Sequence, residues 1–166
     1  LPAHYKFIEI ALSDKKETEM FGEPGATLIP PSREQMGWGV ERIGAPRLWA
    51  EGFTGRGVTV AVIDSGANVA HPDLQANIWS MPGRPRVHGF NAITGVEDPM
   101  DDHNHGTHCS GTIGGTGNNA LGVVGVAWQT RIMALKFLTA DGEGWDSDAI
   151  TCIDYAIAKG AKILSN

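Results

Sequence analysis

An aspartate and a histidine stand in this sequence where acid–base chemistry would need them. Asp64 follows the apolar run 60–63, which predicts a buried strand that ends at a carboxylate. His105 opens a run of small residues that predicts the start of a helix. A carboxylate beside an imidazole fixes the ring tautomer and stabilises its protonated form, so the second nitrogen can take a proton from a hydroxyl. The pair therefore indicates the orienting acid and the general base of a hydrolytic triad.

The third member of such a triad, a nucleophilic serine, is expected later in the chain. The serines lie at positions 13, 32, 65, 80, 110, 147 and 165, and none of them is an obvious nucleophile. Taken singly, each motif is also typical of another role: a turn-forming aspartate for Asp64, and a polar loop residue for His105. The order of the two motifs favours the catalytic interpretation. It also predicts that this polypeptide cannot complete the chemistry alone.

The apolar pattern after residue 39 predicts alternating strands and helices. We expect strands at residues 58–63, 88–93 and 131–138, and a further strand that begins at 163. We expect helices at residues 45–50, 105 to about 115, and 147–159. This alternation predicts fold class α/β, a parallel sheet flanked by helices on both faces.

The last predicted helix carries the clearest signals. Ser147 or Asp146 is its expected cap, and Gly160 its expected stop. The apolar residues that recur at helical spacing, and so predict its core face, are Ile150, Ile153, Ala156 and Ile157.

Composition and charge restrict the partners of this chain. Its 166 residues can bury a sizeable core, and 42% of them are hydrophobic. The net charge of −6 argues against nucleic acid or an anionic membrane surface as a partner. The apolar runs are too short to span a bilayer, and no signal peptide is recognisable. Cys109 and Cys152 predict two buried free thiols, with a bridge between them as the open alternative.

Residues 1–33 differ in character from the rest of the sequence. Residues 5–12 form a short apolar run that predicts a strand, and Pro30 and Pro31 later favour an extended linker. We expect a boundary at residues 32–34, so that 1–33 are an N-terminal extension or propeptide tail and 34–166 the main domain. A chain that begins at leucine and ends inside a predicted strand is expected to be a piece of a larger protein.

From residue 37 to 166 the sequence resembles the subtilisin-like serine proteases, or subtilases, in five ordered motifs. These are VAVIDSG at 60–66, HPDL at 71–74, DDHNHGTHCSGT at 101–112, LGVVGVA at 121–127 and LKFLTADGEG at 135–144. The family places its triad in the order Asp, His, Ser. The resemblance implies that Asp64 is the triad acid and His105 the base. It also implies a subtilisin-like fold whose C-terminal half is absent from this chain.

The implied function is that of a serine endopeptidase that hydrolyses peptide bonds, with Asp and His but not Ser supplied by this chain. The nucleophile and the oxyanion-hole Asn of the family would come later, so we expect the chain alone to be inactive. The implied partners are a polypeptide substrate, the C-terminal part of the same protease and an inhibitory propeptide, in a secreted or extracytoplasmic protein. The alternative function is a non-catalytic calcium-binding remnant or regulatory fragment that binds a peptide or a partner chain.

The resemblance also implies a structural calcium site, because calcium prefers several oxygen ligands from carboxylates and loop carbonyls. The implied side-chain ligands are Asp73 and Asn119, together with Glu34 or Gln35 from the N-terminal segment. The implied main-chain ligands are the carbonyls of Gly117, Leu121 and Val123. The alternative is a glycine-rich turn that Asp73 caps locally.

Residues 141–145 resemble the strand edge that pairs with an extended substrate in this family. The implied substrate-binding residues are Leu138, Gly142, Glu143, Gly144 and Trp145. Glycines let a peptide backbone approach and add a strand. Trp145 would line the pocket for the fourth residue before the scissile bond, with a core or cap aromatic as the alternative. Glu143 would favour basic side chains in the substrate.

Cys109 follows the histidine motif, as in the proteinase K branch of the family, and this position suggests inhibition by mercurials. The neighbouring histidines, His103, His105 and His108, also raise the question of a zinc hydrolase. Zinc hydrolases usually show a clearer ligand set, such as two histidines four residues apart with a glutamate between them. The sequence therefore favours the serine mechanism over a zinc mechanism.

Overall fold

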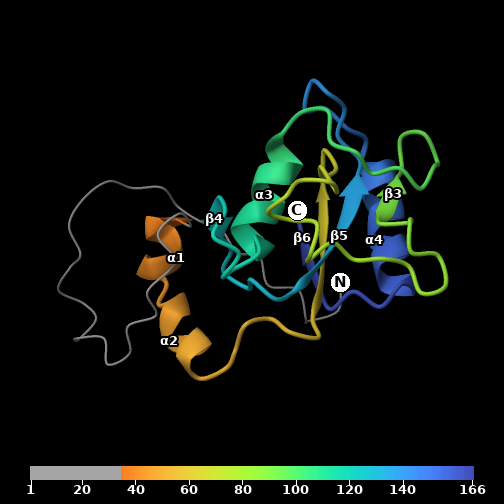
Figure 1. Cartoon of the computed structure of the whole chain (residues 1–166). Coiled ribbons are helices and arrows are strands. Elements are labelled where there is room, and N and C mark those ends of the chain that lie inside the picture. Colours follow the sequence, from red (N-terminus) through yellow and green to blue (C-terminus); the bar gives the residue numbers. More distant parts are fainter. Residues whose placement is uncertain (1–34) are drawn as a thin grey trace.

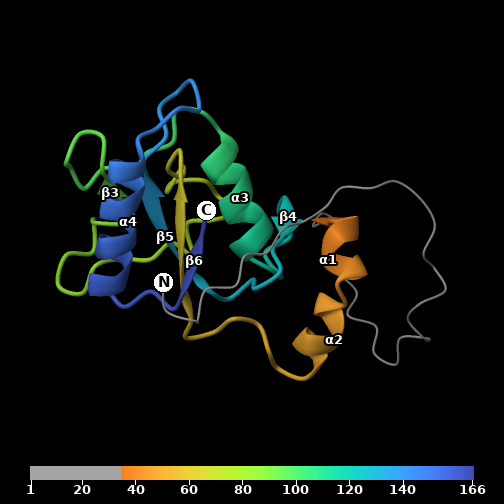
Figure 2. The same ribbon diagram turned by 180° about the vertical axis from the view of Figure 1, so that it is seen from behind.

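The computed structural model describes residues 35–166, so the strand predicted at 5–12, the boundary at 32–34 and Glu34 lie outside the described residues. The elements, in chain order, are β1 (Gln35–Met36), α1 (Trp38–Arg42), α2 (Ala45–Ala50), β2 (Thr59–Asp64), β3 (Gly89–Asn91), α3 (His105–Gly114), β4 (Val123–Val124), β5 (Arg131–Lys136), α4 (Asp146–Ala158) and β6 (Ile163–Ser165). Figure 1 shows their arrangement, and Figure 2 shows it from behind.

A four-stranded sheet of order β3-β5-β2-β6 forms the centre, and all of its strand pairs are parallel. In the register of the central pair, Thr59 lies opposite Arg131 and Asp64 opposite Lys136. A separate short parallel pair joins β1 to β4. The α3 helix covers one face of the central sheet and α4 the other, as both views show (Figures 1 and 2). The predicted α/β fold class is therefore confirmed.

The two faces of the sheet bury two separate cores, because alternate residues of a strand point to opposite faces. Ala61 and Ile63 of β2 pack in the core beneath α4, which contributes Cys152 and Ala156. Val60 and Val62 belong to the core on the α3 side, where the partly buried residues include Cys109 and Ile113. Burial on both faces explains why β2 is an unbroken apolar run.

The predicted core face of α4 is partly wrong. Cys152 and Ala156 are fully buried, whereas Ile150 and Ile157 are each more than half exposed. A helix presents residues four apart to the same surface, and here the pair 152 and 156 faces the sheet. The predicted stop is confirmed, since Gly160 has the left-handed φ of +81°. The predicted cap is wrong, because the N-cap residue is Trp145 and makes no side-chain capping bond.

Two predicted strands are shorter than expected. β5 ends at Lys136 rather than residue 138, because the N–H groups of Phe137 and Leu138 turn back to the Asp64 carbonyl. β3 covers only Gly89–Asn91 of the predicted 88–93. Both endings bring loops to the carboxyl edge of the sheet, which is where open parallel sheets bind ligands.

Candidate active site

Asp64 is the last residue of β2, and its side chain is 8% exposed. Its Oδ1 accepts a hydrogen bond from the Ser65 N–H at 2.7 Å. Both carboxylate oxygens lie within hydrogen-bond distance of Nδ1 of His105, at 2.9 and 2.8 Å. A nearly buried carboxylate with a two-oxygen contact to one ring nitrogen holds that ring in a single orientation.

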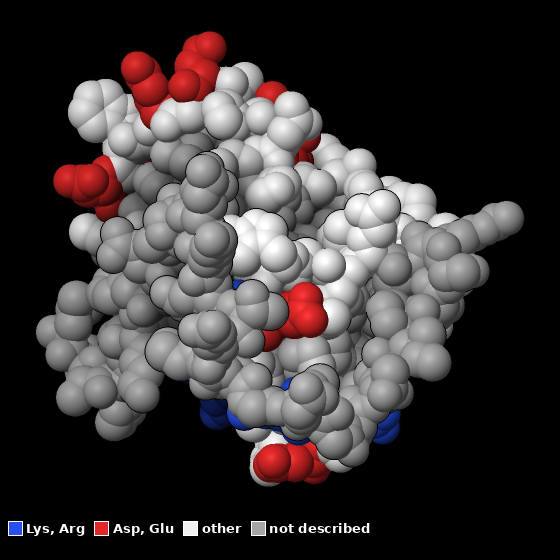
Figure 3. All heavy atoms as spheres, turned by 90° about the vertical axis from the view of Figure 1, so that its left-hand side faces the viewer, with Lys and Arg blue, Asp and Glu red and all other residues white. Residues whose placement is uncertain are grey.

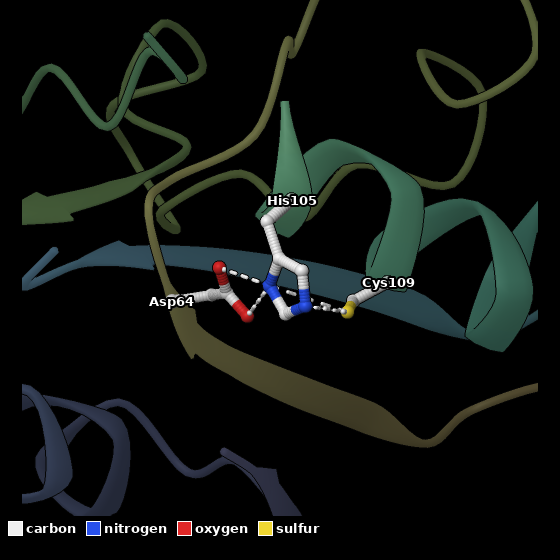
Figure 4. A group of neighbouring side chains, drawn as sticks. All are labelled: Asp64, His105 and Cys109. Carbon is white, nitrogen blue, oxygen red and sulfur yellow. Dashed lines mark hydrogen bonds and ion pairs between the residues drawn. The ribbon is translucent and has the colours of Figure 1, made fainter. Parts of the chain in front are cut away.

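His105 is the first residue of α3, and its side chain is 60% exposed. Asp64 meets the Nδ1 edge of the ring, and Nε2 lies on the other edge (Figure 4). The backbone approaches Asp64 closely because the next residue is glycine: a Cβ on Gly106 would overlap the Gly66 carbonyl oxygen. The small-residue run of α3 thus lets the helix start against the end of β2. The result is an imidazole oriented by an acid on one side and open on the other.

Asp101 organises the loop before His105, a role that the sequence reasoning missed. Its Oδ2 accepts from the N–H and hydroxyl of Thr107, and its Oδ1 accepts from the Ser65 hydroxyl and the N–H groups of His103 and Asn104. Burial raises the pKa of the Asp101 carboxyl, but the hydrogen bonds outweigh burial and lower this pKa to about 2. Asp101 therefore caps the first turn of α3 with its ionised carboxylate. Asn104, the N-cap residue, makes no side-chain capping bond of its own.

Lys136 is a second residue whose role the sequence reasoning missed. Its side chain is almost fully buried at the end of β5, opposite Asp64 in the sheet register. The ammonium donates to the carbonyls of Ser65 and Leu138, at 2.9 and 2.6 Å, and to Asp102 at 2.6 Å. A lysine at the end of an otherwise apolar buried strand was the available signal, since a buried charge requires partners.

Cys109 lies one helical turn after His105 and is half-buried. Its Sγ is 3.8 Å from Nδ1 and 3.9 Å from Nε2 of His105. Burial, followed by the negative charge of Asp64, raises the pKa of the Cys109 thiol. Cys152 is buried beneath α4, and both cysteines are free, so the expectation of free thiols holds while Cys109 is less buried than expected.

Comparisons with known proteins show to which family this chain belongs. Residues 55–166 match the sequence profile of the Subtilase family, which is more than half of the chain. The chain belongs to the subtilase family. It is 31% identical to subtilisin E of Bacillus subtilis (strain 168) over 171 aligned positions, which cover 97% of the chain and 42% of that protein.

Other subtilases are also similar to the chain. A thermophilic serine proteinase of Bacillus sp. (strain AK1) is 38% identical over 66% of the chain and 25% of that protein. Subtilisin-like protease 1 of Plasmodium berghei (strain Anka) is 36% identical over 64% of the chain and 20% of that protein. The chain thus spans less than half the length of each of these relatives.

The segment expected to bind substrate in this subtilase follows Leu138 and is largely exposed. Thr139 N–H donates to the Glu143 carbonyl at 2.8 Å, which folds residues 139–143 into a loop. Gly144 is packed against Phe137, where a Cβ would overlap the Phe137 carbonyl oxygen. Trp145 is 78% exposed, so it is not a core aromatic. It is the N-cap residue of α4, which agrees with the alternative of a cap aromatic. The structure thus leaves residues 142–145 open to solvent.

This loop also approaches the loop before His105 and carries negative charge. A Cβ on Gly142 would lie against the His103 ring, two residues before His105. Acidic side chains gather at the upper end of the surface in Figure 3, the end at which the loop after β5 lies in Figure 1. The exposed acids of this region are Asp141, Glu143 and Asp146.

The residues expected to bind calcium meet in part around Asp73, which is only 4% exposed. Its oxygens accept from Asn119 Nδ2 at 2.7 Å and from the Val123 N–H at 2.8 Å. The Asn119 amide oxygen accepts from the Leu121 N–H instead of facing the carboxylate. Gln35 joins the same region through its N–H, which donates to the Gly122 carbonyl.

Asp73 supplies a carboxylate of the kind that calcium prefers, but both of its oxygens accept from N–H groups, and the Asn119 amide turns its nitrogen toward them. This arrangement therefore provides one of the expected oxygen ligands and does not present the others as a group. The structure does not bring Gly117 to this group through a hydrogen bond; a Cβ on Gly117 would instead overlap the Trp128 ring. Among residues 35–166, the cluster that brings three His, Cys, Asp or Glu ligand atoms together is a different one: Asp64, His105 and Cys109.

Within the described part of the chain, no helix is both long enough and apolar enough to cross a bilayer.

Proposed function

We propose that this chain supplies the acid and the base of a serine endopeptidase of the subtilase family. The observation that carries the proposal is the contact of both Asp64 oxygens with Nδ1 of His105, at 2.9 and 2.8 Å, on a ring that is otherwise 60% exposed. Nδ1–H donates to Asp64, which leaves the lone pair on Nε2. The exposed edge of the ring is the side on which a substrate and a nucleophile can approach.

In the proposed reaction, Nε2 of His105 accepts the proton of a serine hydroxyl as the oxygen attacks the scissile carbonyl. Asp64 stabilises the imidazolium that results. The imidazolium then returns its proton to the leaving amine, and water hydrolyses the acyl-enzyme by the same steps. The serine and the oxyanion donors would come from sequence that follows residue 166 in the complete protease, as the family order Asp, His, Ser requires.

An extended peptide substrate would lie along residues 142–145. Gly142 and Gly144 let a peptide backbone approach, and Trp145 offers an exposed aromatic surface for an apolar side chain. The exposed acids Asp141, Glu143 and Asp146 favour basic side chains in the peptide, because their negative charge attracts positively charged groups.

Calcium would be held by Asp73, Asn119 and Gln35 with the carbonyls of nearby loop residues. Its chemistry there would be structural: it would neutralise the buried Asp73 carboxylate and tie the N-terminal strand to the loop before β4. We further propose that the protease is secreted, and that residues 1–33 include the end of an inhibitory propeptide.

A serine-reactive fluorophosphonate tests the proposed peptidase directly. We expect the intact mass of the complete protease to rise by one probe, and the labelling rate to fall about a thousandfold or more in His105→Ala. His108→Ala is the matched control, since His108 is exposed on the same helix and should label at the wild-type rate. Absence of label in the wild type, or equal labelling in His105→Ala, would favour the alternative of a non-catalytic peptide-binding protein.

A further inference from the structure

His103 carries a half-buried imidazole that the proposed reaction does not use. It lies two residues before His105, and the two rings meet edge to face with their centroids 6.3 Å apart. Nδ1 of His103 is buried and has no hydrogen-bond partner within the described residues. A buried polar atom without a partner destabilises a fold, so the presence of a histidine at this position requires an explanation.

The same ring faces the exposed loop after β5. A Cβ on Gly142 would lie 3.1 Å from Nε2 of His103, which is closer than an ordinary van der Waals contact. The Gly142 backbone therefore packs on the imidazole, and its φ of +77° also favours glycine at this position. Figures 1 and 2 both show this loop beside the segment that enters α3. His103 thus adjoins both the His105 ring and the loop that is expected to bind substrate.

The backbone around His103 is held in place on both sides. Its own N–H donates to Asp101 Oδ1 at 2.9 Å. Asp102 before it pairs with the buried ammonium of Lys136 at 2.6 Å, and Asn104 after it has a left-handed φ of +80°. The ring of His103 therefore stands on a fixed segment and can support a neighbour that is less firmly held.

The loop after β5 is closed by backbone bonds within itself. Thr139 N–H donates to the Glu143 carbonyl at 2.8 Å, and Gly142 N–H donates to the Thr139 carbonyl at 3.0 Å. These two bonds fix the shape of the loop but not its position relative to the base. The start of the loop is held at the Leu138 carbonyl by a buried lysine, and the contact of Gly142 with His103 supports its tip.

We propose that His103 is a positioning residue that holds the substrate loop, residues 139–145, at a fixed distance from His105. The inference rests on the proposed peptidase function and deepens it, because it names the residue that aligns an extended peptide with the base. The packing of the ring against Gly142 offsets the cost of the unpaired Nδ1. His103 acts through the loop and takes no proton in the reaction.

Hydrogen exchange tests the contact without reference to catalysis. We expect His103→Ala to speed deuterium uptake at residues 139–143 by about tenfold or more, because the N–H groups of Thr139 and Gly142 would open more often. His108→Ala is the matched control, since it removes an exposed histidine from α3 and should exchange as the wild type does. Unchanged exchange in His103→Ala overturns the proposal, whatever the enzymatic result.

Substrate length tests the effect on the reaction in the complete protease. A fluorophosphonate requires only the serine and its base, whereas a peptide with four residues before the scissile bond also requires the loop. For this peptide, kcat/KM divided by the fluorophosphonate labelling rate should fall by about ten- to a hundredfold in His103→Ala. An unchanged ratio overturns the proposal. If the wild type takes no label, the proposed function fails, and the exchange result still decides whether His103 holds the loop.

Gly142→Ala provides a variant that keeps His103, for the case in which His103→Ala fails to fold. Its Cβ would press on the ring, so we expect faster exchange in the loop and a lower ratio. Gly83→Ala is the matched control, because Gly83 has a similar φ of +79° but open space around its Cβ position. Where His103→Ala folds, Gly142→Ala should cost less in that background than in the wild type. Equal costs in the two backgrounds overturn the proposal.

Discussion

At the scale of single residues, the candidate site depends on two carboxylates with different partners. Asp64 contacts the His105 ring with both oxygens, whereas Asp101 accepts only from hydroxyl and N–H groups of its own loop and of Ser65. The Asp101 bonds hold the first turn of α3 and therefore the backbone of His105. Asp101 is thus a positioning residue for His105, and in the proposed reaction it would act only through that histidine.

The lowered pKa of Asp101 predicts a specific loss of stability in acid. Its pKa is about 2 in the folded chain against an ordinary value of 3.8, so it contributes stability above pH of about 4. That contribution is lost as the pH falls through about 2. We expect the thermal midpoint of Asp101→Asn to be lower than that of the wild type at neutral pH, with the difference shrinking toward pH of about 2.

Circular dichroism melts across this pH range provide the measurement. Asp154→Asn is the control, because Asp154 is an exposed residue of α4 and should leave the acid dependence unchanged. A constant difference between Asp101→Asn and the wild type at every pH would contradict a stabilising role of the ionised Asp101.

At the scale of elements, Lys136 joins three segments near the Asp64–His105 pair. Its ammonium contacts the residue after β2, the loop before α3 through Asp102, and the start of the exposed loop at Leu138. These segments are distant in sequence and meet only because β2 and β5 are neighbours in the sheet. One buried cation therefore links the end of β2, the loop before His105 and the exposed loop after β5.

Replacement of Lys136 by methionine tests this arrangement. The variant keeps the length of the side chain but leaves two carbonyls without their donor, which costs about 1–3 kcal/mol for each unsatisfied buried group. We expect a lower free energy of unfolding in urea and, in the complete protease, a fall in kcat that exceeds the change in KM. Lys162→Met is the matched control, since Lys162 is exposed and directly precedes β6. Stability of Lys136→Met equal to that of Lys162→Met would be inconsistent with a joining role.

At the scale of the whole molecule, two regions are tied to the central sheet in different ways. The α3 and α4 helices are held by the two cores, whereas β1 is attached through its pairing with β4 beside the buried Asp73. Calcium at Asp73 would strengthen the attachment of β1 to β4. Calcium at Asp73 is therefore expected to change the stability of the molecule without changing the Asp64–His105 contact.

Chelation provides the corresponding test. Removal of calcium with EGTA should lower the thermal midpoint by several degrees, because an ion at a hundred times its dissociation constant stabilises a protein by about 2.7 kcal/mol. Asp73→Asn should melt at the same temperature with and without the chelator, and Asp154→Asn should respond as the wild type does. A wild-type midpoint that EGTA leaves unchanged would show that calcium does not stabilise this protein.

The sequence by itself determined the features that depend on local pattern. Unbroken apolar runs marked β2 and β5 as strands buried on both faces, and a glycine after the last turn marked the end of α4. Asp64 after a strand and His105 at a helix start were also visible, because motif and position are local properties. The five ordered motifs then identified the family.

Only the tertiary structure decided which groups meet. Asp64 and His105 are 41 residues apart, and their contact depends on how α3 packs against the end of β2. The partners of Lys136, and the distance of the Cys109 sulfur from the His105 ring, also depend on how the elements pack. Helical spacing wrongly placed Ile150 and Ile157 in the core, because periodicity describes a helix alone and the sheet selects which face is buried.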